Sequence, residues 1–135
     1  MGVCKVNWDA AVDSHRRRIR IGAIVRDHSG VVLAMLSETM ASIRDPATAE
    51  ALAARRGVEL YKSLGIMKLI LEGDALQIVQ VLQSTGGRWD PYVLIIEDTR
   101  QMLRIFQECS VSHVWREANV EAHKLAKLGF FCRGE

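Results

Sequence analysis

Residues 46–65 read PATAEALAARRGVELYKSLG, and within this stretch the hydrophobic periodicity changes from that of strands to that of a helix. Pro46 suits the first turn of a helix, because its missing N–H would be unpaired there in any case. From Ala49 to Leu64 the apolar residues return at helical spacing, and Gly65 ends the helix. A helix here separates an upstream group of strands from a downstream group.

Three upstream segments alternate apolar and polar residues, as half-buried strands do. They are Val3–Val12, Ile19–Asp27 and Val31–Ser37. Brief polar turns join them, and His28-Ser29-Gly30 is the clearest of these. Strands joined by such short turns pair in opposite directions, so we expect an antiparallel meander.

Downstream of the helix, strands and helices alternate. The expected elements are a strand at Lys68–Glu72, helices at Ala75–Leu82 (broken by Gly86-Gly87) and Tyr92–Phe106, and a strand at Val111–Trp115. Asn119 is a suitable N-cap for a last helix that carries Ala122, Leu125 and Ala126 on its core face. Strands separated by helices run parallel and cross over right-handedly.

The predicted fold class is therefore α/β. We expect a mixed five-stranded sheet, with three antiparallel strands followed by two parallel ones, flanked by helices. With 135 residues and no repeat or linker, the chain is expected to form a single domain over residues 1–135.

Composition narrows the class of protein. The hydrophobic fraction of 49% and the charged fraction of 25% are typical of a soluble globular domain. No apolar run approaches the roughly 20 residues that span a bilayer, and no secretory signal is visible. Three widely spaced cysteines form neither a disulfide framework nor a metal knuckle. We expect an intracellular protein of the nucleus or cytoplasm, with no membrane partner, and favour a monomer.

The net charge is only +2, but basic residues crowd into His15–Arg20. Most such runs are solvated hairpin ends. Arg16 and Arg17 become candidate phosphate contacts if the neighbouring residues form a nuclease site.

Three carboxylates are candidates for chemistry. Separately, Asp9 in the first strand is an ordinary solvated acid, Glu50 suits a helix N-terminus, and Asp74 suits a helix cap. Together they are harder to explain, because a central first strand beside a parallel fourth strand brings all three to one cleft. Clustered carboxylates raise one another's pKa values, which is costly without a cation, and oxygen ligands suit Mg²⁺ or Mn²⁺.

The order of these motifs resembles that of type 1 ribonucleases H. Glu50 stands in AEALAA (residues 49–54) and Asp74 in LEGDA (residues 71–75). The segment VWREANVEAHKLA, residues 114–126, resembles the closing signature of the plant reverse-transcriptase-associated branch of that family. The resemblance spans about residues 5–130.

This resemblance implies a metal-dependent endoribonuclease that hydrolyses the RNA strand of RNA–DNA hybrids with two metal ions, in a domain related to retroelements. Asp9 would bridge both ions, Glu50 and Asp74 would complete their coordination, and His123 would occupy a fourth ligand position. Arg116 and Lys124 flank this site, and we weigh phosphate contacts equally against ordinary solvated charges for both.

Several residues depart from the family pattern. His123 replaces the usual Asp, Ala10-Ala11 replaces a frequent Gly-Ser, and Leu76 replaces a polar residue, often Gln. Few of the residues that would contact the nucleic acid therefore match the family pattern. This keeps a second hypothesis open: a catalytically weak or inactive ribonuclease H-like module that binds nucleic acid or a protein.

The remaining aromatic candidates are assigned mainly structural positions. We expect Trp8 and Trp115 to be core residues of strands and Trp89 to be exposed, where a tryptophan can stack on bases. His113 is expected to be a structural core or interface residue.

Overall fold

The computed structural model describes residues 3–13, 15–41, 45–65, 68–84 and 92–128. The strands are β1 (Cys4–Asp13), β2 (Arg18–Arg26), β3 (Val32–Ala41), β4 (Lys68–Gly73) and β5 (Glu108–His113). The helices are α1 (Pro46–Ser63), α2 (Leu76–Gln83), α3 (Val93–Leu103), the short 3-10 helix η1 (Arg116–Asn119) and α4 (Val120–Leu128).

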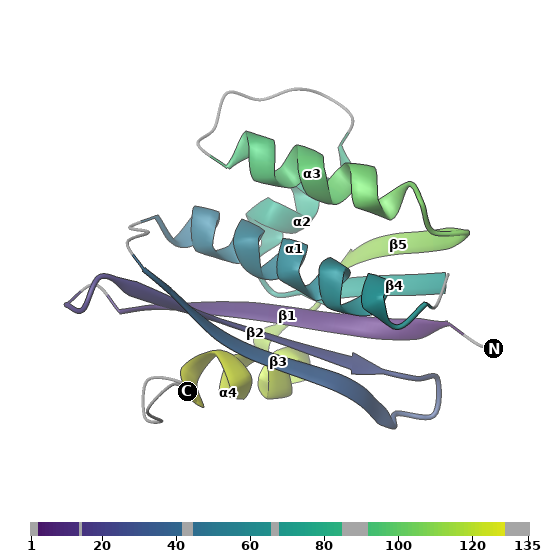
Figure 1. Ribbon diagram of the computed structural model, residues 1–135, viewed down its shortest axis with the longest axis horizontal. Helices are drawn as coiled ribbons and strands as arrows, with labels where there is room; N and C mark the ends of the chain where they lie inside the picture. The colour runs from purple at the N-terminus through teal and green to yellow at the C-terminus, as the bar shows by residue number, and fades with distance from the viewer. Residues whose placement is uncertain (1–2, 14, 42–44, 66–67, 85–91, 129–135) are drawn as a thin grey trace.

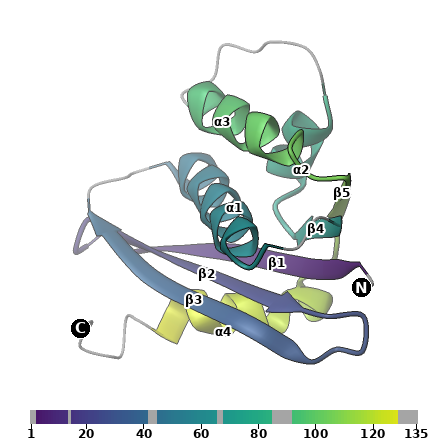
Figure 2. The ribbon, with the colours of Figure 1, turned by 45° about the vertical axis from the view of Figure 1, so that its right-hand side comes forward.

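The strands form one sheet in the order β3-β2-β1-β4-β5. The pairs β1–β2 and β2–β3 are antiparallel, whereas β1–β4 and β4–β5 are parallel. Figures 1 and 2 show α1, α2 and α3 on one side of the sheet and α4 on the other. The predicted mixed sheet, with β1 at its centre, is confirmed.

The two faces of β1 carry different kinds of side chain, apolar toward α1 and polar toward α4. Val6 and Trp8 are fully buried and lie against α1, where Gly57 lets the helix approach the strand. Asn7 and Asp9 alternate with them and therefore face the α4 side, yet both are also buried. A polar pair buried on a central strand needs partners, and the residues around α4 supply them.

α4 lies unusually close to the sheet because its contact face is built from small residues. Ala122 and Ala126 are fully buried, and Gly22 of β2 lies directly beneath them. A Cβ at Gly22 would overlap the Ala122 carbonyl oxygen and the Ala126 amide nitrogen. This close approach sets the height of α4 above β1 and thereby positions His123 on that helix.

One expectation about the C-terminal third is wrong. β5 ends at His113, and Trp115 lies beyond it with 74% of its surface exposed. Its alternation with His113 resembles a strand, but the β4–β5 ladder ends at the pair Gly73–His113. Asn119 directly precedes α4, where the N-cap is expected, but it also closes η1, and its side chain hydrogen-bonds to the Trp8 carbonyl and the Asn7 amide.

The other sequence expectations fall close to the observed elements. Trp8 is a core residue as predicted, and helix and strand ends differ from prediction by a few residues. α3 ends at Leu103, so Phe106 is buried just beyond the helix instead of within it. Trp89 and Gly86-Gly87 lie outside the described residues. Among the described helices, none has the length and apolar character that crossing a membrane requires.

Candidate metal centre

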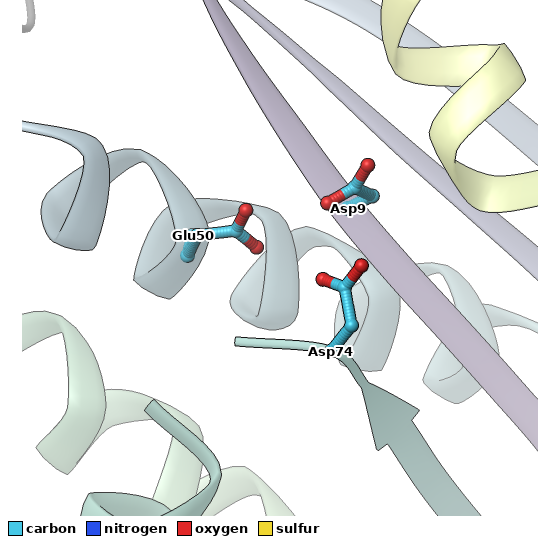
Figure 3. Close-up of side chains that lie close together, drawn as sticks. All are labelled: Asp9, Glu50 and Asp74. Atoms are coloured by element: carbon cyan, nitrogen blue, oxygen red, sulfur yellow. The ribbon is translucent and has the colours of Figure 1, made fainter. Parts of the chain in front are cut away.

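Asp9 and Asp74 meet because the β1–β4 ladder stops at the pair Trp8–Gly73. Asp9 is the next residue of β1, and Asp74 is the first residue after β4. The two strands part at this level, so each carboxylate projects into the opening between them. Figure 3 shows both side chains approaching each other from neighbouring segments.

Glu50 reaches the same opening from the first turns of α1. Asp45 caps that helix, accepting hydrogen bonds from the Ala47 amide at 3.2 Å and the Thr48 hydroxyl at 2.9 Å. Ala49 is buried, so the helix is anchored on the sheet beside Glu50. Asp45 was not singled out from the sequence, although an Asp preceding Pro at a helix start is a recognisable cap signal.

The three carboxylates converge, as predicted (Figure 3). One oxygen from each of Asp9, Glu50 and Asp74 lies within 4.8 Å of the others. Asp9 is only 1% exposed, and its Oδ1 and the Glu50 Oε1 are buried without a hydrogen-bond partner. Buried acceptor oxygens without partners cost free energy, so this geometry suits the binding of a cation.

The electrostatics of the cluster agree with that geometry. Burial, followed by the charges of Asp9 and Asp74, raises the pKa of Glu50 well above its ordinary value. Burial and the charge of Asp9 also raise the pKa of Asp74, although the Arg116 guanidinium opposes this. Both shifts report mutual repulsion in a poorly solvated space, which a divalent cation would relieve.

His123 enters from α4 on the opposite side of the sheet. Its Nδ1 lies 2.6 Å from Asp9 Oδ2, whereas among the described residues the cluster with metal-ligand spacing comprises only the three carboxylates. His123 thus contacts Asp9, one of the three clustered carboxylates. Its role as a fourth ligand stays a prediction.

The four predicted basic residues lie at different distances from the cleft. Arg116 is at the site, with its Nε 3.4 Å from Asp74 Oδ2. Lys124 is exposed on α4, next to His123. Arg16 and Arg17 are exposed between β1 and β2, beyond the end of β1 at Asp13, which is four residues from Asp9, or about 13 Å at a strand's rise of about 3.3 Å per residue. Their contacts with nucleic acid stay predictions.

A buried amide pair beneath the site was missed by sequence reasoning. Asn119 donates from Nδ2 to the Trp8 carbonyl at 2.8 Å and accepts from Asn7 Nδ2 at 3.1 Å. Asn7 also donates to Glu72 Oε1 at 3.2 Å. These bonds tie η1 to β1 immediately before Asp9. The available signal was Asn7 itself, a polar residue inside the central strand.

The sequence profile of the reverse transcriptase-like family matches residues 7–129 of this chain. The chain belongs to the reverse transcriptase-like family. The match runs from β1 to the end of α4 and so includes Asp9, Glu50 and Asp74 in this family member. A comparison with curated proteins finds no match.

Solved structures show that this reverse transcriptase-like protein has a ribonuclease H-like fold. Ribonuclease H1 from the halophilic archaeon Halobacterium salinarum NRC-1 superposes with a TM-score of 0.88 at 22% identity, covering 96% of this chain and 98% of that one. The N-terminal ribonuclease H domain of rv2228c from Mycobacterium tuberculosis gives 0.86 at 17% identity, covering 97% and 95%. LC11 ribonuclease H1, isolated from compost by a metagenomic approach and solved with an RNA/DNA hybrid, gives 0.82 at 18%, covering 93% and 94%.

Proposed function

We propose that this protein is a metal-dependent endoribonuclease that hydrolyses the RNA strand of RNA–DNA hybrids. The observation that carries the proposal is the convergence of Asp9, Glu50 and Asp74 on one opening, with buried oxygens that lack partners. A similar fold in ribonucleases H1, one of them solved with an RNA/DNA hybrid, supports the same substrate class.

The residues present fit a divalent cation. Asp9, Glu50 and Asp74 offer hard oxygen ligands, as Mg²⁺ and Mn²⁺ prefer. When bound, such ions would supply a more acidic water as nucleophile and stabilise the leaving oxygen. Buried Asp9 would hold the central position, because Glu50 and Asp74 approach it from α1 and from the end of β4.

The protein would also have to place the phosphodiester beside this cluster. Arg116, already at Asp74, is the first candidate for a phosphate contact, because its side chain is 68% exposed and free to turn outward. Lys124 would act from α4, and Arg16 with Arg17 would reach the backbone farther along the duplex. His123 is proposed as a fourth ligand, which requires its imidazole to turn from Asp9 toward the cation.

Some finer assignments belong to the same proposal. The closing segment, residues 114–126, supports membership of the plant reverse-transcriptase-associated branch and descent from a retroelement. We propose that residues 1–135 form a single domain that acts as a monomer in the nucleus or cytoplasm. Gel filtration and fluorescence microscopy of a tagged protein test these points.

Cleavage of a labelled RNA–DNA hybrid tests the activity. We expect product with Mg²⁺ or Mn²⁺ and none with a chelator, and products ending in 5′-phosphate. Asp9→Asn should abolish cleavage without changing the circular dichroism spectrum, because a neutral amide of the same shape binds cations poorly. Cleavage by Asp9→Asn at the parental rate, or cleavage that persists in chelator, would contradict the proposed mechanism.

A second candidate function is a ribonuclease H-like module that binds nucleic acid or a protein without cleaving. Two contacts at the site favour this candidate: His123 Nδ1 lies beside Asp9 Oδ2, and Arg116 Nε lies beside Asp74 Oδ2. Both groups compete with a cation for ligand oxygens. Tight hybrid binding with no cleavage in either metal would select this candidate.

A further inference from the structure

Trp115 is an exposed aromatic side chain in the segment between β5 and η1, next to Arg116 in the chain. It leaves 74% of its surface exposed, although a large aromatic side chain gains much free energy by burial. The next residue, Arg116, has its Nε 3.4 Å from Asp74 Oδ2, so Trp115 is one residue from a group that touches the cluster.

The backbone on both sides of Trp115 is held in place. The Val114 amide donates to the Gly73 carbonyl at 3.0 Å, one residue beyond the last β4–β5 pair, Gly73–His113. The Trp115 carbonyl accepts from the Ala118 amide at 2.9 Å and so starts η1. The segment is therefore anchored to the end of β4 before Trp115 and to η1 after it.

The indole ring is held as well. The rings of His113 and Trp115 meet edge to face, with centroids 5.1 Å apart and an interplanar angle of 81°. Their contact is expected of residues two apart in extended chain, because both side chains project from the same face of the strand. The ring thus presents exposed surface in a defined orientation, which lowers the entropy cost of binding a flat partner.

We infer that Trp115 stacks on an unpaired base next to the cleavage position, so that the preferred substrate is an RNA–DNA hybrid adjoining a single-stranded nucleotide. This inference rests on the proposed function and narrows its substrate class. Bases inside a duplex are already stacked on one another, whereas bases at ends and single-stranded junctions are free to stack on aromatic side chains. Arg116 would hold the phosphate beside the stacked nucleotide.

Binding without cleavage tests the inference. In an Asp9→Asn background, fluorescence anisotropy would compare a blunt RNA–DNA hybrid with the same hybrid carrying a single-stranded extension. We expect the extended hybrid to bind more tightly, and Trp115→Ala to weaken its binding by about tenfold while leaving the blunt hybrid nearly unchanged. Trp115→Phe should retain most of the preference, because phenylalanine also offers a ring face.

The matched control is Ile105→Ala, an exposed apolar residue before β5 and thus at the opposite strand end from Trp115. It should bind both hybrids like the parent. Extended hybrid should also quench tryptophan fluorescence less in Trp115→Phe than in the parent, which a purely structural role would not produce.

Two results would overturn the inference and leave the proposed function standing: equal binding of both hybrids by the parent, or an unchanged preference in Trp115→Ala. If Trp115→Ala alters only self-association in sedimentation experiments, the ring is a protein contact and the inference is wrong. Failure of the parent to bind either hybrid would overturn the proposed function and the inference together.

Discussion

His123 Nδ1 lies 2.6 Å from Asp9 Oδ2, so an imidazole from α4 already engages an oxygen that a cation would use. A neutral imidazole adds no charge to the site, whereas an aspartate at the same position would add one. The choice of residue at this position therefore bears on which metal supports activity, because Mg²⁺ prefers oxygen and Mn²⁺ accepts nitrogen more readily.

His123→Asp should raise Mg²⁺-supported cleavage relative to Mn²⁺-supported cleavage, by about tenfold, the low end of the effect of changing a group beside a metal ligand. The measurement is the ratio of initial rates in the two metals. Gln107→Asp, at an exposed neutral position just before β5 and so at the strand end away from Asp74, adds the same single charge and should leave the ratio unchanged. An identical ratio in His123→Asp would make His123 a bystander.

Asn119→Ala should lower the free energy of unfolding by about 1–3 kcal/mol, because the Trp8 carbonyl and the Asn7 amide would lose buried partners. Urea denaturation measures this change. Glu117→Ala in the same short helix removes an exposed side chain and should change little. Equal free energies of unfolding for the two variants would show that the Asn7–Asn119 hydrogen bonds do not stabilise the fold.

Among the elements, α4 is the one whose position depends most on a single contact. Gly22 has no side chain between β2 and the backbone of α4, and Ala122 and Ala126 complete the contact. Backbone atoms cannot turn aside as a side-chain end can, so this contact has little room to adjust. Because α4 carries His123, any displacement of the helix also changes the site.

Gly22→Ala should destabilise the protein by about 1–3 kcal/mol, the usual cost of forcing extra volume into a packed core, and should reduce cleavage as well. The same substitution at Gly57 meets only side chains, the nearest being Val6 at 3.1 Å, and gains helix propensity of up to about 1 kcal/mol. Thermal melts of both variants test whether Gly22→Ala lowers stability more than Gly57→Ala. Greater destabilisation by Gly57→Ala would contradict this account of α4.

At the scale of the whole molecule, the carboxylate cluster makes stability depend on pH and on cations. The raised pKa values of Glu50 and Asp74 mean that the folded state holds protons more tightly than the unfolded state. The stabilising effect of protonating Glu50 and Asp74 in the folded state is therefore fully present below their ordinary pKa values of 4.5 and 3.8. It is lost as pH rises through the raised values of the folded state.

Glu50→Gln should therefore stabilise the metal-free protein at neutral pH, because the amide resembles the protonated acid and carries no charge. The gain over the parent should be absent below pH 4.5 and grow as pH increases. Melting temperatures in chelator across this range provide the measurement. A difference that does not vary with pH would mean that repulsion within the cluster is not its cause.

Divalent cations should offset the loss of stability that repulsion among the three carboxylates causes at neutral pH. We expect Mg²⁺ or Mn²⁺ to raise the melting temperature of the parent, with a gain of about 2.7 kcal/mol when the cation is present at about 100 times its dissociation constant. Asp9→Asn should lose most of this gain. Glu108→Gln removes an exposed acid of β5 far along the strand from the cluster and should keep it. Equal metal stabilisation of all three proteins would place the cation elsewhere.

The sequence by itself determined the fold class and three residues of the candidate site. Alternation identified the strands, helical spacing identified α1, and short turns or intervening helices decided which strands run antiparallel and which run parallel. These features depend on local backbone geometry and chain chirality, so they are readable without knowing distant contacts. Strand order then placed Asp9, Glu50 and Asp74 together, because a parallel β1–β4 pair aligns the ends from which two of them project.

Only the tertiary structure decided which of the remaining side chains have partners. Trp115 and Trp8 look alike in sequence, yet Trp8 is buried in β1, which pairs with strands on both sides, whereas the β4–β5 ladder ends before it reaches Trp115. Asn119 resembles a helix cap, but its side chain finds the Trp8 carbonyl, 111 positions away in the chain. The contact of His123 with Asp9 likewise depends on how closely α4 approaches Gly22. Hydrogen bonding and burial of single side chains depend on packing between distant segments, which local periodicity does not encode.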